Sequence, residues 1–345
     1  MTASDLPSLF SPIQVGNAQL KHRIVLSPLT RLRAYDDHVP GPQAATYYAQ
    51  RASMPGTLLI TEGTIIAARA GGLPNIPGIY NDAQIKAWKE ITDAVHAKGS
   101  FIYAQLWAFG RAADPTLLAS EGHEHVGPSA IPLEEHWHAD VGPQALRALT
   151  VPEIKEYVQL YVTAARNAME AGFDGVEIHG ANGYLVDQFL QDVSNSRADE
   201  YGGSVENRTR FALEVVDAVV AAVGASRTAI RLSPWSEWQG MGMADPIPTF
   251  SYYVSKLKER GLAYIHVIEP RINGVDDAVK AASNPESNDV LRKIWGDRPY
   301  IAAGGFTRTK ALDTAEEKGG LISFGRLFIA NVSFKKMQPE TKIWR

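Results

Sequence analysis

Residues 150–184 of the chain read TVPEIKEYVQLYVTAARNAMEAGFDGVEIHGANGY. The first part predicts a helix over Val151–Ala171, because Thr150 and Glu153 form the two halves of a capping box and a proline occupies the first turn. A short apolar run, Gly175–His179, follows and predicts a buried strand. The stretch is therefore one helix followed by one strand, which is the repeating unit of an α/β fold.

The same unit recurs along the whole chain. Further helices are predicted over Ala83–Lys98, Ser204–Val223, Thr249–Arg260 and Thr309–Lys318. Apolar runs predict eight strands: His22–Leu26, Thr57–Thr61, Ser100–Leu106, Gly175–His179, Thr228–Ser233, Tyr264–Ile268, Tyr300–Ala303 and Leu321–Phe324. Apolar strands separated by helices indicate parallel strands that are buried on both faces. A closed (β/α)8 TIM barrel is the simplest such arrangement, and a doubly wound open sheet is the alternative.

Two further features complete the predicted architecture. The segment IQVGNAQLKHRIV, residues 13–25, predicts an N-terminal β-hairpin that turns at Gly16-Asn17 and can plug the N-terminal mouth of the barrel. The stretch Gly110–Leu149, after the third strand, carries four prolines and predicts a long irregular loop. Because no segment reads as a linker, we expect a single domain over residues 1–345.

Composition narrows the classes of function. The net charge is −4 without a basic run, which argues against nucleic acid and anionic membranes as partners. No stretch is apolar enough to cross a bilayer, and the N-terminus lacks the features of a signal peptide. The absence of cysteine excludes disulfides and thiolate sites, and it fits a cytoplasmic protein. Four histidines, His123, His125, His136 and His138, match no metal-ligand spacing, so we expect a solvated loop and no metal.

Polar side chains follow the fourth predicted strand. In a barrel, groups at the carboxyl ends of strands face the active-site mouth. His179 and Asn182 each carry a neutral N–H donor, and two convergent donors can stabilise a negative charge that develops on a carbonyl oxygen. Tyr184 is a phenol that keeps its proton at neutral pH and can deliver it to a carbon. The alternative interpretation is a hydrogen-bonded turn that leads into a helix.

Two other groups of residues predict an anion site. Arg231 lies within an apolar strand and needs an anionic partner, which is either a carboxylate or an anionic cofactor ring. Gly304 and Gly305 end the seventh strand, and Gly325 and Arg326 end the eighth. The loops after these two strands form the usual phosphate site of such barrels, where glycines let backbone N–H groups approach the oxygens. Arginine adds a bidentate partner.

The loops after the first three strands carry uncharged polar groups. Thr30 follows the first strand, Gly63 the second, and Gln105 ends the third. Threonine and glutamine side chains suit the edge of a heteroaromatic ring. Taken singly, each of these residues is better explained as a loop cap.

The chain also resembles a known family. From His179 to Phe211 it reads HGANGYLVDQFLQDVSNSRADEYGGSVENRTRF. This closely resembles the signature of the old yellow enzyme family of FMN-dependent ene-reductases, which includes 12-oxophytodienoate reductase-like proteins. The likeness spans roughly residues 9 to 331 and includes SPLTRLRA, TEGTIIAARAGG, YAQLW, AIRLSP, IEPR, AAGGF and FGRLFIAN in the family's order.

The resemblance implies bound FMN and assigns its contacts. Thr30 would hydrogen-bond the flavin C4 carbonyl, Gln105 the pyrimidine edge, and Arg231 would lie beside N1 and the C2 carbonyl. Three residues would line the ring, namely Pro28, Leu29 and Gly63. Four would hold the phosphate, namely Gly304, Gly305, Gly325 and Arg326.

The resemblance also implies the reaction. NADPH, rather than NADH, would reduce FMN, and hydride would pass from flavin N5 to the β-carbon of an α,β-unsaturated carbonyl compound. His179 and Asn182 would bind the carbonyl oxygen, and Tyr184 would protonate the α-carbon. Trp107 and Trp238 would shape the substrate pocket. The protein would be a monomer or a homodimer.

The end of the chain departs from the family. After Asn331 the sequence reads VSFKKMQPETKIWR, so we expect a shortened C-terminal tail from about residue 332. Two alternatives therefore stay open beside ene-reduction. One is a flavin-dependent isomerase or tailoring enzyme that acts on a natural-product enone. The other is a flavin-binding protein whose turnover is impaired by the altered tail.

Overall fold

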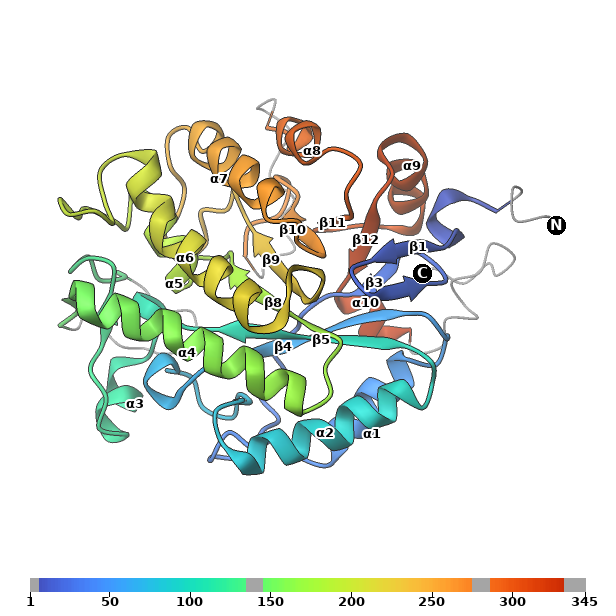
Figure 1. Ribbon diagram of the computed structural model, residues 1–345, viewed down its shortest axis with the longest axis horizontal. Helices are drawn as coiled ribbons and strands as arrows, with labels where there is room; N and C mark the ends of the chain where they lie inside the picture. Colours follow the sequence, from blue (N-terminus) through green and yellow to red (C-terminus); the bar gives the residue numbers. More distant parts are fainter. Residues whose placement is uncertain (1–5, 135–144, 275–285, 332–345) are drawn as a thin grey trace.

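Eight parallel strands close into one barrel, and they follow each other around it in chain order (Figure 1). The computed structural model describes residues 6–134, 145–274 and 286–331. The barrel strands are β3 (Ile24–Leu26), β4 (Leu58–Ile65), β5 (Phe101–Trp107), β8 (Gly175–Gly180), β9 (Thr228–Leu232), β10 (Tyr264–Ile268), β11 (Tyr300–Ala303) and β12 (Leu321–Phe324). Because β12 pairs with β3, the sheet has no edge. The closed TIM barrel is confirmed, and the doubly wound alternative is wrong.

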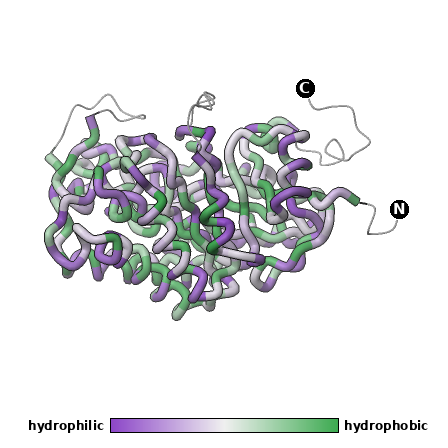
Figure 2. The backbone as a smooth tube through the Cα atoms, turned by 90° about the horizontal axis from the view of Figure 1, so that it is seen from above, coloured by the Kyte–Doolittle hydropathy of each residue, from purple (hydrophilic) through white to green (hydrophobic). Residues whose placement is uncertain are grey.

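Helices surround the barrel on its outside (Figure 1). They are α1 (Gln43–Arg51), α2 (Asp82–His96), α3 (Pro115–Ser120), α4 (Val151–Glu170), α5 (Leu185–Leu190), α6 (Val205–Val223), α7 (Ile247–Glu259), α8 (Asp289–Trp295), α9 (Arg308–Lys318) and α10 (Arg326–Ala330). The five predicted helices correspond to α2, α4, α6, α7 and α9. The capping box of Thr150 and Glu153 is present at the start of α4. Hydrophilic and hydrophobic residues are mixed along the outer helices, as one face packs on the strands (Figure 2).

Short 3₁₀ turns join several of these elements. They are η2 (Ser8–Phe10), η3 (Ala68–Ala70), η4 (Gly110–Ala112), η5 (Ala225–Arg227) and η6 (Trp238–Gly240). In the part of the chain that the structure describes, no helix combines the length and the apolar character that crossing a membrane requires.

Side chains alternate between the two faces of the barrel strands and so belong to two apolar clusters, one outside and one inside the barrel. In β4, Leu59 packs with the surrounding helices, whereas Leu58 and Ile60 belong to a second cluster inside the barrel. Successive side chains of a strand point to opposite faces, so these two residues fill the barrel interior. Tyr103 of β5 and Tyr264 of β10 belong to the same inner cluster, with ring centroids 5.5 Å apart. The barrel is therefore packed solid toward its N-terminal end.

The predicted hairpin closes that end. Strands β1 (Ile13–Val15) and β2 (Ala18–Leu20) pair antiparallel, and Val15 and Leu20 are fully buried in the inner cluster. The turn needs glycine, since Gly16 has φ +52° and an added Cβ would lie 2.0 Å from the Ser226 carbonyl oxygen. The hairpin is thus confirmed as a plug at the N-terminal mouth.

The long loop after the third barrel strand is only partly irregular. Within Gly110–Leu149 the structure has η4, then α3, and a short parallel pair of β6 (Val126–Gly127) with β7 (Arg147–Ala148). The carboxylate of Asp114 caps α3 by accepting from the backbone N–H groups of Thr116 and Leu117. Residues 135–144, which include His136 and His138, lie outside the described residues, as does the tail predicted from about residue 332.

Candidate functional site

A cavity of about 680 Å³ opens at the carboxyl ends of the barrel strands. Its volume lies in the range of small-molecule and cofactor sites. It is lined by all fifteen site residues that the sequence predicts, namely Pro28, Leu29, Thr30, Gly63, Gln105, Trp107, His179, Asn182, Tyr184, Arg231, Trp238, Gly304, Gly305, Gly325 and Arg326. Residues from seven barrel strands and their loops therefore meet at one place.

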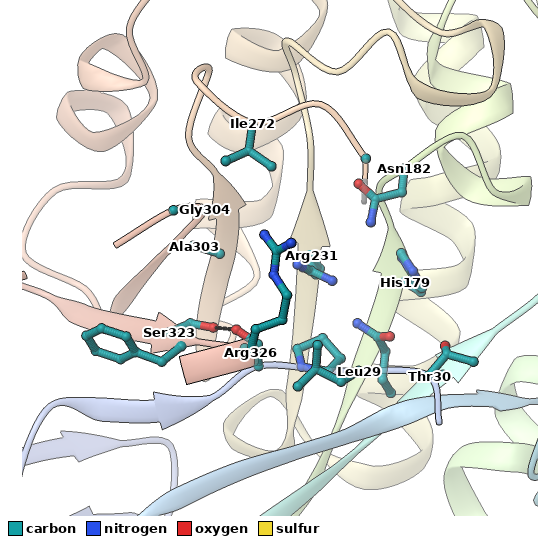
Figure 3. A pocket seen from close by; sticks show the side chains of 18 of the residues that line it. Leu29, Thr30, His179, Asn182, Arg231, Ile272, Ala303, Gly304, Ser323 and Arg326 are labelled. Atoms are coloured by element: carbon teal, nitrogen blue, oxygen red, sulfur yellow. Dashed lines mark hydrogen bonds between the residues drawn. The ribbon is translucent and has the colours of Figure 1, made fainter. Parts of the chain in front are cut away.

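Figure 3 shows how these side chains lie around the cavity. His179 and Asn182 stand together on one side, whereas Ala303, Gly304 and Ser323 lie on the other. The side chain of Arg326 extends into the space between the two sides (Figure 3). The cavity thus has one end with neutral hydrogen-bonding groups and one end with glycines and a cation.

The backbone around Asn182 is held in an unusual conformation. Asn182 has φ +57°, which is uncommon for a residue other than glycine. Its N–H donates to Ser233 Oγ at 2.7 Å, and its carbonyl accepts from Gln239 Nε2 at 2.6 Å. The next N–H, of Gly183, donates to the buried carboxyl of Asp187 at 2.9 Å. These bonds direct the Asn182 side chain to the cavity, and such strained positions are often functional.

His179 and Asn182 both carry buried polar atoms without a protein partner. His179 is 4% exposed, and its Nδ1 has no hydrogen-bond partner, nor has Asn182 Oδ1. Burial, with the positive charge of Arg231 nearby, lowers the pKa of His179 well below its ordinary value. The imidazole is therefore neutral at physiological pH. An unpaired buried polar group costs about 1–3 kcal/mol, so this end of the cavity is arranged for a polar ligand.

Aromatic rings hold Tyr184. It starts α5 just after Asn182, and its ring meets Trp107 and Phe109 edge to face, with centroids 4.7 and 5.3 Å apart. The His179 ring is 4.9 Å away in the same kind of contact. Edge-to-face packing on three sides restricts the ring's motion. The phenol and the imidazole are consequently presented together at the cavity wall.

A layer of buried polar side chains lies beneath the cavity, between it and the apolar plug. Gln105 Nε2 donates to Glu177 Oε1 at 2.8 Å, and His266 Nδ1 lies 2.9 Å from Glu177 Oε2. Arg231 stands beside His266 and His179 in the strand register. Burial lowers the pKa of Arg231, and nearby Glu177 opposes this effect. Glu177 therefore acts on Arg231 through its negative charge. Arg231 Nε keeps no hydrogen-bond partner, so an anionic cofactor ring stays open as a further partner.

The loop that carries Thr30 is fixed by a buried glutamate. Strand β4 bulges between Ile60 and Gly63. Within this bulge the carboxyl of Glu62 accepts from the Arg31 N–H at 3.1 Å and from the Tyr48 hydroxyl at 3.4 Å. Bulges next to active sites commonly redirect a side chain. Burial raises the pKa of Glu62 to about 7.

The opposite end of the cavity suits a phosphate. Gly304 and Gly305 have φ +113° and +57°, and Thr307 caps the N-terminus of α9 immediately after them. Arg326 lines the same region. Backbone N–H groups at a helix start together with an arginine form a common anion site. The donor set as a whole suits a flat ring with polar edges that carries a phosphate.

Several lining residues were missed by the sequence analysis. They include Ser27, Ile272, Gly274 and Ser323. A signal existed for Ser323, because it lies near the carboxyl end of the eighth predicted strand, two residues before Gly325. The hydroxyls of Ser27 and Ser323 are hydrogen-bonded to each other. Ile272 and Gly274 come from the loop after β10, where no periodicity indicates which residue faces inward.

Comparisons with known proteins show what the chain is similar to. Residues 8–340 match the family model of the NADH:flavin oxidoreductase / NADH oxidase family. The chain is 52% identical over 331 residues to a chanoclavine-I aldehyde reductase of Penicillium roqueforti, covering 94% of this chain and 87% of that one. It is 49% identical over 338 residues to an NADP-dependent oxidoreductase of Aspergillus flavus, with the same coverage.

A solved structure extends the likeness to the fold. The old yellow enzyme homologue from Zymomonas mobilis superposes with a TM-score of 0.87 at 41% identity. The superposition covers 96% of this chain and 92% of that one.

Proposed function

The chain belongs to the NADH:flavin oxidoreductase / NADH oxidase family, that of the old yellow enzymes, and we propose that it reduces the C=C bond of α,β-unsaturated carbonyl compounds. Membership makes the protein an NAD(P)H-dependent flavin oxidoreductase whose cofactor is FMN. The observation that carries the proposal is that His179, Asn182 and Tyr184 line one cavity together with a phosphate-type end. The aldehyde reductase among its relatives favours unsaturated aldehydes as well as ketones as substrates.

The donor set fits FMN. Arg231 Nε is a buried cationic donor without a hydrogen-bond partner, as the anionic edge of a reduced ring requires. Thr30, Gln105 and Arg231 would hold the ring edge, whereas Pro28, Leu29 and Gly63 would line its face. The phosphate would bind at Gly304, Gly305, Gly325 and Arg326. When bound, FMN supplies the two-electron chemistry between NADPH and the substrate.

His179 and Asn182 would bind the substrate's carbonyl oxygen. A neutral imidazole and a carboxamide can each donate one N–H to this oxygen, and both donors are uncharged. Negative charge grows on that oxygen as the C=C bond is reduced. Donors fixed in advance stabilise it without reorganisation, and one such donor typically contributes about 10²–10³-fold in rate. The bonds that fix Asn182, to Ser233 and Gln239, provide this preorganisation.

Tyr184 would donate the proton to the α-carbon. Its ring is confined by Trp107 and Phe109, so the hydroxyl keeps one orientation relative to His179 and Asn182. A positioned acid of this kind contributes about 10²–10⁴-fold. Trp107 and Trp238 would form the walls that accept the rest of the substrate.

An anaerobic two-step experiment tests the proposal. The FMN-loaded protein is reduced with one equivalent of NADPH and then mixed with 2-cyclohexenone in a stopped-flow spectrometer. We expect the flavin to be reoxidised at a rate that rises with enone concentration, and cyclohexanone to form in equal amount. Cyclohexanone in place of the enone is the control, because it has no C=C bond to reduce.

Two outcomes would contradict ene-reduction. If the enone does not reoxidise the flavin, the protein binds FMN without this turnover. If the enone is converted into a product of the same mass while the flavin stays reduced, the protein is an isomerase.

A further inference from the structure

Trp238 and Gly274 meet at one wall of the cavity although they come from different loops. Trp238 lies in η6, after β9, and Gly274 lies in the loop after β10; both line the cavity. A Cβ built on Gly274 would lie 2.2 Å from Trp238 Cδ2 and 2.3 Å from Cε3. The indole therefore occupies the space that any other side chain at position 274 would need.

The backbone on both sides of this contact is held by hydrogen bonds. Asn273 Oδ1 accepts from the Glu237 N–H at 2.9 Å and lies 3.2 Å from Ser236 Oγ. The Trp238 N–H in turn donates to Ser236 Oγ at 3.2 Å. The residue before Gly274 thus ties the loop of Trp238 to its own loop.

The far side of the Trp238 loop is anchored as well. Arg111 Nη2 donates to the carbonyl oxygens of Gln239 and Gly240, each at 3.0 Å. Gln239, with φ +59°, donates to the Asn182 carbonyl. Because the backbone is fixed at both ends, a clash at Gly274 would displace the indole ring rather than the loop.

We propose that Gly274 is a specificity-determining residue, whose missing side chain gives Trp238 the position that leaves room for bulky substrates. This rests on the proposed ene-reductase function, since it describes the substrate end of the same cavity. A methyl group at position 274 and the ring it displaces both take space from the cavity. Removing the indole frees that space and makes position 274 unimportant for substrate size.

Holoenzyme variants test this with two enones of different size, 2-cyclohexenone and carvone. We expect Gly274→Ala to lower the ratio of kcat/KM for carvone to that for cyclohexenone by at least ~10-fold, the effect of about one methyl group in a pocket. Trp238→Ala should raise this ratio. In the Trp238→Ala background, adding Gly274→Ala should leave it unchanged.

Gly122→Ala is the matched control. Gly274 has φ +57°, and Gly122 also has a positive φ, +79°, but nothing lies within 4 Å of a Cβ added to Gly122. It therefore carries the same backbone strain without a contact, and its ratio should equal that of the wild type. This separates a loss of pocket shape from a general loss of stability.

A binding measurement keeps the proposal independent of turnover. Dissociation constants of the saturated ketones, cyclohexanone and dihydrocarvone, are obtained by spectral titration of the oxidised holoenzyme. We expect Gly274→Ala to weaken dihydrocarvone binding and to spare cyclohexanone. Two ratios decide the outcome: kcat/KM for carvone to that for cyclohexenone, and the dissociation constant of dihydrocarvone to that of cyclohexanone. The proposal is overturned if Gly274→Ala leaves both ratios within about twofold of wild type. It is also overturned if Gly274→Ala changes them equally in the Trp238→Ala background. If the wild type binds these ketones but reduces neither enone, the proposed function fails while position 274 is still tested.

Discussion

The two ends of the barrel differ in how their buried groups are satisfied. At the N-terminal end, the hairpin residues Val15 and Leu20 pack on Leu58 and Tyr103, and all four are fully buried. At the carboxyl end, His179, Asn182 and Arg231 carry buried polar atoms without a protein partner. The first end is completed by the chain itself, whereas the second is completed only by a ligand. Stability and function are therefore separated along the barrel axis.

The largest expected effect concerns the ligand end. Tyr184→Phe keeps the aromatic packing on Trp107 and Phe109 but removes the proton donor. We expect the rate of flavin reoxidation by cyclohexenone to fall by roughly 10²–10⁴-fold. Reduction by NADPH and the unfolding free energy should stay at wild-type values. Loss of FMN binding in this variant would show that Tyr184 has a structural role instead.

The opposite pattern is expected at the plugged end. Leu20→Ala removes a fully buried side chain from the inner cluster and leaves a cavity. We expect a loss of about 3 kcal/mol in the free energy of unfolding, measured by urea denaturation. The rate per folded molecule should not change. A change in kcat of the folded fraction would mean that the two ends are coupled, contrary to the comparison.

Removing FMN tests whether the ligand stabilises the carboxyl end of the barrel. Binding to the native state alone stabilises by about 2.7 kcal/mol when free FMN is 100 times its Kd. We expect the apoprotein to unfold at lower temperature than the holoprotein, as measured by circular dichroism. Riboflavin, which lacks the phosphate, should restore less of this stability. Equal restoration would argue against the phosphate role of Gly304, Gly305 and Arg326.

An effect that depends on pH is expected from Glu62, which supports the Thr30 loop. Its pKa is raised to about 7 by burial, so the folded state holds the proton more tightly than the unfolded state. Its contribution to stability is full below the unfolded pKa and is lost as pH rises to about 7. Glu62→Gln lacks this titration but keeps an acceptor for the Arg31 N–H.

The measurement for Glu62 is a difference between two proteins. The unfolding free energy of Glu62→Gln, relative to wild type, should rise from about pH 4.5 to 7 and then level off. Its slope should stay below about 1.4 kcal/mol per pH unit, the limit for one proton. Burial also lowers the pKa of His22 and raises that of Asp187, but these two groups are present in both proteins and cancel in the difference. A difference that does not vary with pH would contradict the raised pKa.

The two ends also differ in how far the sequence predicts them. Strand periodicity and the hairpin turn at Gly16-Asn17 identify the plugged end, because apolar alternation and turn chemistry are local signals. The polar and glycine site residues were found because they lie in or just after predicted strands, whereas Trp107 and Trp238 were implied only by the family resemblance. Glu177 and His266 were missed as a pair, since their contact joins β8 and β10, which are not neighbours in the sheet.

Loop structure was the least predictable part. Helix α3 was missed within Gly110–Leu149, although Asp114-Pro115 is a typical helix start, because the helix spans only six residues. The contact of Trp238 with Gly274 gave no signal, as it depends on how two loops fold against each other. Tertiary packing determines contacts between loops, and no periodic pattern in the sequence indicates them.

The central claim is that His179, Asn182 and Tyr184 act on one substrate above bound FMN. The most direct test is a crystal structure of the FMN-loaded protein with an unreactive ketone such as cyclohexanone. We expect the ketone oxygen to lie within hydrogen-bond distance of both His179 and Asn182, with the Tyr184 hydroxyl near the α-carbon. A ketone bound elsewhere in the cavity, or with its oxygen away from both donors, would contradict this claim.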